Sequence, residues 1–272
     1  RVTWTRPTAG AAGLLSYDFV VKSGATTVST TSLTPATLAR TVTGLTPGQK
    51  YTFEVRGVNR FGPGPFGVSN EITAAGAPNP PTALQAVRGN GSATLSWTPG
   101  ADNSSAITGY TLQIRNGAAV VETRSITGNV SSAVISGLNN GTAYNFRLQA
   151  INAIGTSALS AVSNTVTPAT VPGLVQIGAP TQGAPNGALT ASANWNPPLS
   201  NGGAAITNYR VKALRMAADG TTVLSTEGDV TVGSTVRTRS FTLPAGTYRF
   251  DVSAINGVGE GPAVRSEAIA AR

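Results

Sequence analysis

The chain has 272 residues, with 19 Lys or Arg, 11 Asp or Glu, 32 Gly and 17 Pro, and a formal net charge of +8. It contains no His and no Cys, which excludes a Ser-His-Asp triad, a Cys-His pair, disulfides and the ordinary zinc, haem and iron–sulfur sites. The length suits two ordinary domains or three small ones, and no apolar run approaches the roughly 20 residues of a membrane-spanning helix.

One pattern occurs three times along the chain. Each copy has a Trp, a Tyr 13 or 14 residues later, then a Leu before a turn and a second Tyr after it. Each second Tyr is followed by a Phe two positions on and by an Asn eight positions on. We expect these residues to form the core: Trp4, Tyr17, Leu45 and Tyr51 in the first copy, Trp97, Tyr110, Leu138 and Tyr144 in the second, and Trp195, Tyr209, Leu243 and Tyr248 in the third.

Apolar and polar residues alternate within each copy, as in residues 94–97 and 144–150. Strict alternation places one face of a strand in a core and the other in water, which is typical of antiparallel sheets. Turn signals such as Asn-Gly and Pro-Gly separate these stretches, and no segment shows a sustained period of 3.6. The pattern therefore predicts an all-β protein built as sandwiches.

The repeated Trp, Tyr, Leu and Tyr positions resemble the fibronectin type III module over essentially the whole chain. The resemblance implies three tandem seven-stranded immunoglobulin-like sandwiches, each with a central Trp and with the second Tyr bonding back toward the preceding turn. The Ala-, Gly-, Thr- and Ser-rich composition is similar to that of the bacterial branch found in secreted proteins. The third copy departs from the pattern, because Leu243 precedes Tyr248 by five residues and not six.

The predicted modules are residues 1–76, 77–168 and 169–272, divided at the Pro-rich segments 77–81 and 168–172. Short Pro-containing joints are stiff. Because seven antiparallel strands begin at one pole and end at the other, we expect a rod of three units, each roughly 30 Å long and about 90–100 Å in total.

The first module differs at its start. Residues 83–87 and 173–177 read as strands that precede Trp97 and Trp195, whereas Arg1 already lies in the Trp4 strand. We therefore expect the first module to be N-terminally incomplete and to lack its first strand. An unpaired edge attracts another strand, so we expect residues 2–5 to be covered in the native assembly, by an upstream segment or by a strand from a neighbouring subunit.

Two sets of residues are candidates for interaction. Phe61 and Phe66 fill slots that hold aliphatic residues in the other copies, so we expect core positions, with sugar stacking as the alternative. Arg210, Lys212 and Arg215 nearly alternate on one strand. We interpret them as a solvated face, with contact to an acidic cell-wall polymer as the alternative. No free aromatic residues lie between basic ones, which argues against nucleic acid.

The acidic residues do not indicate catalysis. Glycoside hydrolysis needs two carboxylates at a fixed separation, and the 11 acids are spread over three modules. Asp219, Glu227 and Asp229 share one predicted hairpin but lack the alternating ligand pattern of a calcium loop. We therefore expect no enzymatic activity, no catalytic residue, no metal and no cofactor.

These observations predict a non-catalytic extracellular scaffold or interaction segment of a bacterial surface or filamentous assembly, with protein partners or self-assembly. Polysaccharide is the other class of partner that we consider. Two alternatives stay open: a spacer region of a secreted polysaccharide-degrading enzyme, and a structural component of a phage tail or virion.

Overall fold

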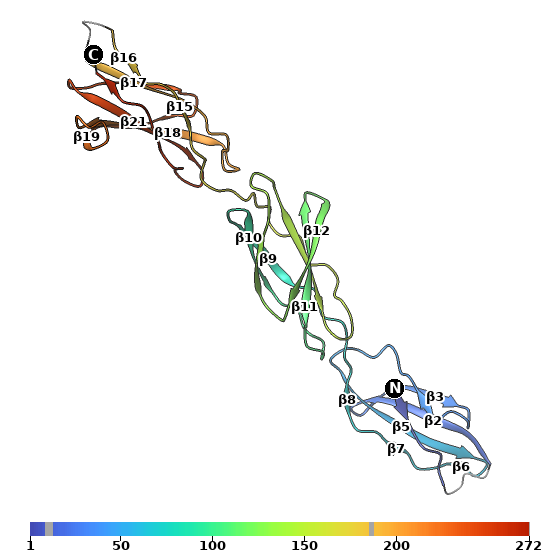
Figure 1. Ribbon diagram of the computed structural model, residues 1–272. Coiled ribbons are helices and arrows are strands. Elements are labelled where there is room, and N and C mark those ends of the chain that lie inside the picture. The colour runs from blue at the N-terminus through green and yellow to red at the C-terminus, as the bar shows by residue number, and fades with distance from the viewer. Residues whose placement is uncertain (9–12, 185–187, 272) are drawn as a thin grey trace.

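The computed structural model describes residues 1–8, 13–184 and 188–271, and these residues form strands and turns without a helix. Figure 1 shows three β-sandwiches arranged end to end, with the N- and C-terminal ends of the chain in the two outer ones. The all-β prediction and the tandem arrangement are thus confirmed. We refer to residues 1–76, 77–168 and 169–272 as the first, second and third modules.

The second module is the most regular. Two three-stranded antiparallel sheets face each other, in the orders β13-β10-β9 and β12-β11-β14. The strands are β9 (Thr82–Arg88), β10 (Ser92–Thr98), β11 (Gly109–Asn116), β12 (Ala119–Thr127), β13 (Ser132–Ser136) and β14 (Asn145–Ile151).

The third module repeats this plan with longer central strands. One sheet holds β15, β16, β17 and β20, and the other is built on β19-β18-β21 with two short strands beside β21. The strands are β15 (Gln176–Ile177), β16 (Thr181–Gln182), β17 (Thr190–Asn196), β18 (Ile206–Met216), β19 (Val223–Gly233), β20 (Thr238–Thr242), β21 (Thr247–Asn256), β22 (Val264–Arg265) and β23 (Ile269–Ala270).

The first module has one complete sheet and one reduced sheet. The complete sheet runs β3-β2-β5 with three short strands beside β5, whereas β1 pairs only with β4 among the described residues. The strands are β1 (Val2–Thr3), β2 (Leu14–Ser23), β3 (Thr26–Leu33), β4 (Ala39–Arg40), β5 (Lys50–Asn59), β6 (Gly62–Pro63), β7 (Gly67–Val68) and β8 (Ile72–Thr73).

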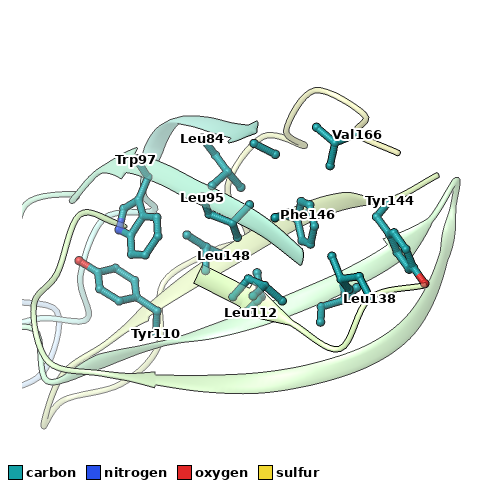
Figure 2. Packing of buried hydrophobic residues seen from close by; sticks show 14 of the residues in the cluster. Leu84, Leu95, Trp97, Tyr110, Leu112, Leu138, Tyr144, Phe146, Leu148 and Val166 are labelled. Carbon is teal, nitrogen blue, oxygen red and sulfur yellow. The ribbon is translucent and has the colours of Figure 1, made fainter. Parts of the chain in front are cut away.

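A Trp–Tyr pair lies in the core of every module. In the second module the Trp97 and Tyr110 rings meet edge to face, with centroids 5.2 Å apart, and Figure 2 shows them beside Leu95 and Leu148. The equivalent centroid distances are 5.7 Å in the first module and 5.6 Å in the third. Such aromatic contacts add to the stabilisation from burying the side chains themselves.

The first core is smaller than the other two. Trp97 and Leu138 are buried in the second module, but their counterparts Trp4 and Leu45 are only half-buried. In the second module, Leu84 and Ala86 of β9 join the core cluster. No described strand of the first module takes this place, so part of its apolar surface stays open.

The tyrosine after the Leu turn binds backbone in all three modules, but not in the same way. Tyr51 Oη accepts the Thr46 N–H, and Tyr144 Oη accepts the Asn139 N–H. The residue after the Leu in the third module is Pro244, which has no N–H to donate. Tyr248 Oη therefore donates to Pro244 O instead.

The last segment of the second module is not a regular strand. Ser157, Ser160 and Ser163 each accept, through the side-chain oxygen, a backbone N–H of β14. Each serine hydroxyl then donates to the carbonyl of the next residue. A serine at every third residue thus completes the hydrogen bonding of β14 where a ladder was expected.

Candidate interaction surfaces and module joints

The joint between the first and second modules is fixed by main-chain hydrogen bonds. On one side, Gly48 N–H donates to Ala74 O. On the other side, Gly76 N–H donates to Asn103 O, and the buried Asn152 side chain donates to Gly76 O at 2.8 Å. The linker backbone is therefore held by both modules within three residues.

The joint between the second and third modules has the same construction. Gly141 N–H donates to Pro168 O, which ties the linker to the second module. Thr170 N–H donates to Gly202 O, and the Asn256 side chain donates to Thr170 O at 2.8 Å.

Only one linker residue separates the two attachments at each joint. At the second joint this residue is Ala169, which is 5% exposed and whose N–H donates to Gly89 O. Two backbone dihedrals per residue are the only soft variables of a chain, so little freedom remains for one module to turn against the next.

Direct packing between turns supports the second joint. Gly203 has φ of +85°, and a Cβ atom there would lie 2.4 Å from Gly141 N, which no real contact allows. Gly141 and Gly203 come from different modules, and their backbones can meet because Gly203 carries no side chain.

Asn152 and Asn256 are the residues that build these joints. Asn152 Nδ2 also donates to Asp102 O and Ser105 O, and Asn256 Nδ2 to Asn201 O. Their Oδ1 atoms accept N–H groups two and three residues further on. Each side chain therefore fastens two loops of its own module to the incoming linker. The sequence repeat marked these positions, but it gave no reason to assign them to a joint.

Phe61 and Phe66 lie at the surface of the first module. Phe61 is 83% exposed, with the Arg60 guanidinium 4.6 Å from the ring centroid. Phe66 is 38% exposed beneath Arg56, which also pairs with Asp18 at 2.9 Å. The expectation of a core position is wrong for both residues. The slot of Phe61 is a turn after β5 whose counterpart Ile154 is exposed as well. A hollow of about 590 Å³ lies beside Phe61, lined also by Leu14, Pro63 and Pro65.

Of the basic residues of β18, Arg210 is paired with acids of its own module. Arg210 forms two hydrogen bonds to Asp229, at 2.8 and 2.6 Å, and approaches Glu260 at 3.3 Å. These bonds raise the pKa of Arg210 and lower that of Asp229. Lys212 lies opposite Asp229 in the sheet, and Arg215 donates to Ala245 O. The three residues share one strand but do not form a free cationic stripe.

The acidic residues of the β18–β19 hairpin are not brought together. Asp219 accepts hydrogen bonds from the Thr221 and Thr222 N–H groups and from the Thr222 hydroxyl, and these bonds lower its pKa to about 2. Glu227 instead accepts from Ser225. Within residues 1–8, 13–184 and 188–271, no three acidic side chains gather in a way that could hold a metal ion.

The geometry and the repeats together define tandem β-sandwich modules of the immunoglobulin-like kind, and comparison with known proteins identifies their family. The model of the fibronectin type III domain matches residues 1–73 and 79–166. The chain belongs to this family.

Three curated relatives illustrate the range of similar proteins. The mouse protein sidekick-2 is 27% identical over 96% of the chain, and the human fibronectin type-III domain-containing protein 3A is 29% identical over 82%. Chitinase A1 of Niallia circulans is 35% identical over 57% of the chain. The chain spans only 13%, 18% and 21% of the lengths of these proteins.

Among solved structures, the chicken CNTN1 FN1-FN3 domains align over 99% of the chain and 93% of that structure, with 19% identity and a TM-score of 0.38. No helix capable of crossing a membrane occurs in the described part of the chain.

Proposed function

We propose that the chain is a non-catalytic extracellular scaffold segment, a stiff rod that holds its neighbours at a set distance on a bacterial surface or in a filamentous assembly. The observation that carries this proposal is the pair of joints. Asn152 and Asn256 bind the linker carbonyls of Gly76 and Thr170, so that each linker is fastened to both of its modules. A flexible tether would instead require linker residues that are not hydrogen-bonded to the modules on either side.

The surface chemistry agrees with a scaffold role. Arg210 of β18 is paired with Asp229 and Glu260 of the same module, which weakens the electrostatic attraction of this strand to nucleic acid or another polyanion. The second module has a compact core without disulfides. It can therefore fold in an oxidising or in a reducing environment. Protein partners are the class of ligand that we propose for the rod.

A second candidate function is a spacer within a secreted polysaccharide-degrading enzyme. The similarity to chitinase A1, whose name identifies chitin as its substrate, favours this alternative. Incubation of the chain with insoluble chitin distinguishes a spacer that does not touch the polysaccharide from one that binds it. A pure spacer stays in solution, whereas a chain that contacts the polymer through Phe61 sediments with it and is released by Phe61→Ala.

Small-angle X-ray scattering of the chain tests the rod itself. We expect a maximum dimension of about 100 Å, as three sandwiches in line require. A markedly shorter maximum with a broad, multi-conformer profile would contradict the stiff scaffold. Incubation with polysaccharide and ester substrates should give no turnover, and turnover that disappears with a chelator would overturn the non-catalytic assignment.

A further inference from the structure

Strand β3 is the outermost strand of its sheet in the first module. Among the described residues it pairs with β2 and with no other strand, and Figure 1 shows it on the outside of the sandwich. Successive residues of a strand direct their backbone groups to opposite sides. Every second N–H and C=O of β3 therefore faces a side on which no described strand lies, and such an edge is a template for a further strand.

The composition of β3 does little to protect this edge. Its eight residues are Thr, Ser, Val and Leu, without a charge, a Pro or a Gly, and most of them are exposed. Their side chains make no hydrogen bond or ion pair with other described residues. Val21 lies opposite Ser29 and Lys22 opposite Thr27, so Val28 forms a bulge. The regular part of the edge is therefore residues 29–33.

The core tyrosines align this edge with that of the second module. The tyrosine of β2 lies opposite Leu33, and the tyrosine of β11 lies opposite Ile126. Residues 29–33 thus match residues 122–126 one for one, and the register shifts at the same place in both pairings. The two edges can be compared position by position.

Charged side chains cover the edge in the second module. Glu122 and Arg124 stand at the positions of Ser29 and Thr31. Arg124 donates to Glu122 at 2.6 and 2.8 Å, and also to Ser136 O at 2.7 Å. Since Ser136 belongs to the opposite sheet, Arg124 spans the sandwich at this edge. A strand that approached β12 would have to displace water from this ion pair, which is how charged residues protect an edge.

The third module also carries charge here. By the same alignment, Asp229 of β19 stands at the position of Thr30, and it is paired with Arg210 at 2.6 Å. Glu227 adds a second acid to the strand. Of the strands β3, β12 and β19, only β3 is free of charged residues.

The charges behind β3 are already paired. Lys22 and Asp18 lie on β2, one strand in from the edge, and are bound to Glu54 and Arg56 of β5 at 3.0 and 2.9 Å. Arg40 of β4 lies over an aromatic ring of the core. A strand that approaches β3 therefore meets hydroxyl and methyl groups first.

We propose that residues 29–33 of β3 pair antiparallel with the same residues of a second copy of this chain, across a twofold axis at Thr31. Thr30 then lies opposite Ser32 of the second copy, and Ser29 opposite Leu33. Side chains on the same face meet, and the sheets β3-β2-β5 of two copies become one. Because this pairing supplies a partner for the scaffold proposed above, it rests on that role.

A second copy is the occupant that this edge fits. A twofold contact requires a surface that is complementary to itself, and an uncharged edge meets this condition without placing like charges opposite each other. Thr and Val also favour extended pairing. Five residues on each side bury much less than the roughly 1,200–2,000 Å² of a stable interface. We therefore expect a weak dimer, which becomes important when chains are held side by side.

Sedimentation equilibrium of the full chain over a concentration series tests the association. We expect the average mass to rise toward twice that of the monomer at millimolar concentration, and to change little with added salt, because the contact holds no charge. A chain that stays monomeric at this concentration would overturn the proposal. Growth beyond the dimer into fibrils would mean open-ended edge pairing and would contradict the twofold axis.

Hydrogen exchange locates the contact without any substitution. On dimerisation, the outward-facing amides within residues 29–33 should exchange more slowly by roughly tenfold or more, as newly paired amides do. The amides of the matching residues 122–126 should not change. A dimer that leaves the exchange of residues 29–33 unaltered would place the contact elsewhere and refute the assignment.

Charge substitutions test the register. Thr30→Lys with Ser32→Lys places lysine opposite lysine twice across the axis and should lower the association constant by roughly tenfold or more. Thr30→Glu with Ser32→Lys places opposite charges there and should restore it. All these positions are exposed, so the variants should fold. Failure of the Glu and Lys chain to recover association would contradict the register.

The matched control lies in the second module. Thr123→Lys with Ser125→Lys introduces the same charges at the same two positions of β12, which are also exposed, and should leave the association unchanged. An equal loss in both lysine chains would mean repulsion between whole molecules and would contradict a contact at β3. Scattering of the dilute chain separates the two proposals: an extended chain that does not dimerise refutes the pairing and leaves the rod, whereas a flexible chain that dimerises refutes the rod.

Discussion

Asn256 and Thr170 stand 86 residues apart in the chain and are joined by a hydrogen bond of 2.8 Å from the side-chain amide to the linker carbonyl. Asn256 is only 4% exposed, and its remaining amide contacts fix two loops of the third module. The position of the linker is therefore set by the same side chain that organises the pole of the module.

Asn256→Ala should loosen the second joint. It leaves buried donors and acceptors unpaired, which costs about 1–3 kcal/mol per group, so the third module should also become less stable. Calorimetry measures the stability, and scattering measures the loss of extension. Asn194→Ala is the matched control, because Asn194 donates to Ala179 within its own module and should leave the extension intact.

Gly203→Ala should disturb the same joint by overlap. The new Cβ would lie 2.4 Å from Gly141 N, so the two modules must separate or tilt. Gly220→Ala is the control, since it has φ of +68° but nothing within 4 Å of the new atom. It suffers only the left-handed strain of about 1–2 kcal/mol. A chain that keeps its full extension with Gly203→Ala would show that this contact does not hold the joint.

Trp97→Ala should unfold the second module and leave the other two folded. Emptying an aromatic core site costs about 3–5 kcal/mol, a large part of the stability of a small domain, and the three core clusters are separate. Trp4→Ala should cost less, because Trp4 is only half-buried. Loss of all three modules in one calorimetric transition would contradict their independence.

Phe61→Ala should leave the stability of the first module within about 0.5 kcal/mol of the original, as expected for an exposed side chain. Phe53→Ala, at a position 6% exposed, should cost about 3–5 kcal/mol. Denaturant unfolding of the two variants makes the comparison. A large loss with Phe61→Ala would mean that the ring stabilises the fold.

The third module should lose stability in acid through Asp219. Its pKa falls from the ordinary 3.8 to about 2, chiefly because the Thr222 side chain donates a hydrogen bond to it. A lowered pKa stabilises the fold above pH 3.8, and this contribution disappears as the pH falls from 3.8 to about 2. Asp219→Asn should flatten the dependence on pH in that window, which unfolding curves at a series of pH values would show.

The core of each module was predictable because the repeated Trp, Tyr and Leu residues lie on strands of alternating polarity. The local sequence alone then indicates which face of a strand is buried. Phe61 aligns with the aliphatic Ile154, which suggests a core position, but the alignment does not reveal that both positions face water. The Asn256 role was hidden because its partner Thr170 belongs to the linker, and no local pattern reports such a distant contact. Tyr248 changed its partner because Pro244, which follows Leu243, has no N–H and offers only its carbonyl.

The serines of the second module show a second reason why the sequence did not predict the whole fold. Ser157, Ser160 and Ser163 recur every third residue, a period that fits neither a strand nor a helix. Their hydroxyls bond β14 in place of a regular ladder, so the last strand was expected as a strand and is an irregular segment. The signal was present as a spacing of three, and its meaning depended on the position of β14.

Distances across the two joints test the central claim most directly. The chain has no Cys, so spin labels on Ser32→Cys with Thr94→Cys, and on Thr94→Cys with Thr231→Cys, report one joint each in double electron–electron resonance. The stiff-rod account predicts a single narrow distance distribution for each pair, which Asn152→Ala broadens at the first joint and Asn256→Ala at the second. Broad distributions in the unaltered joints, as wide as those of the variants, would contradict it.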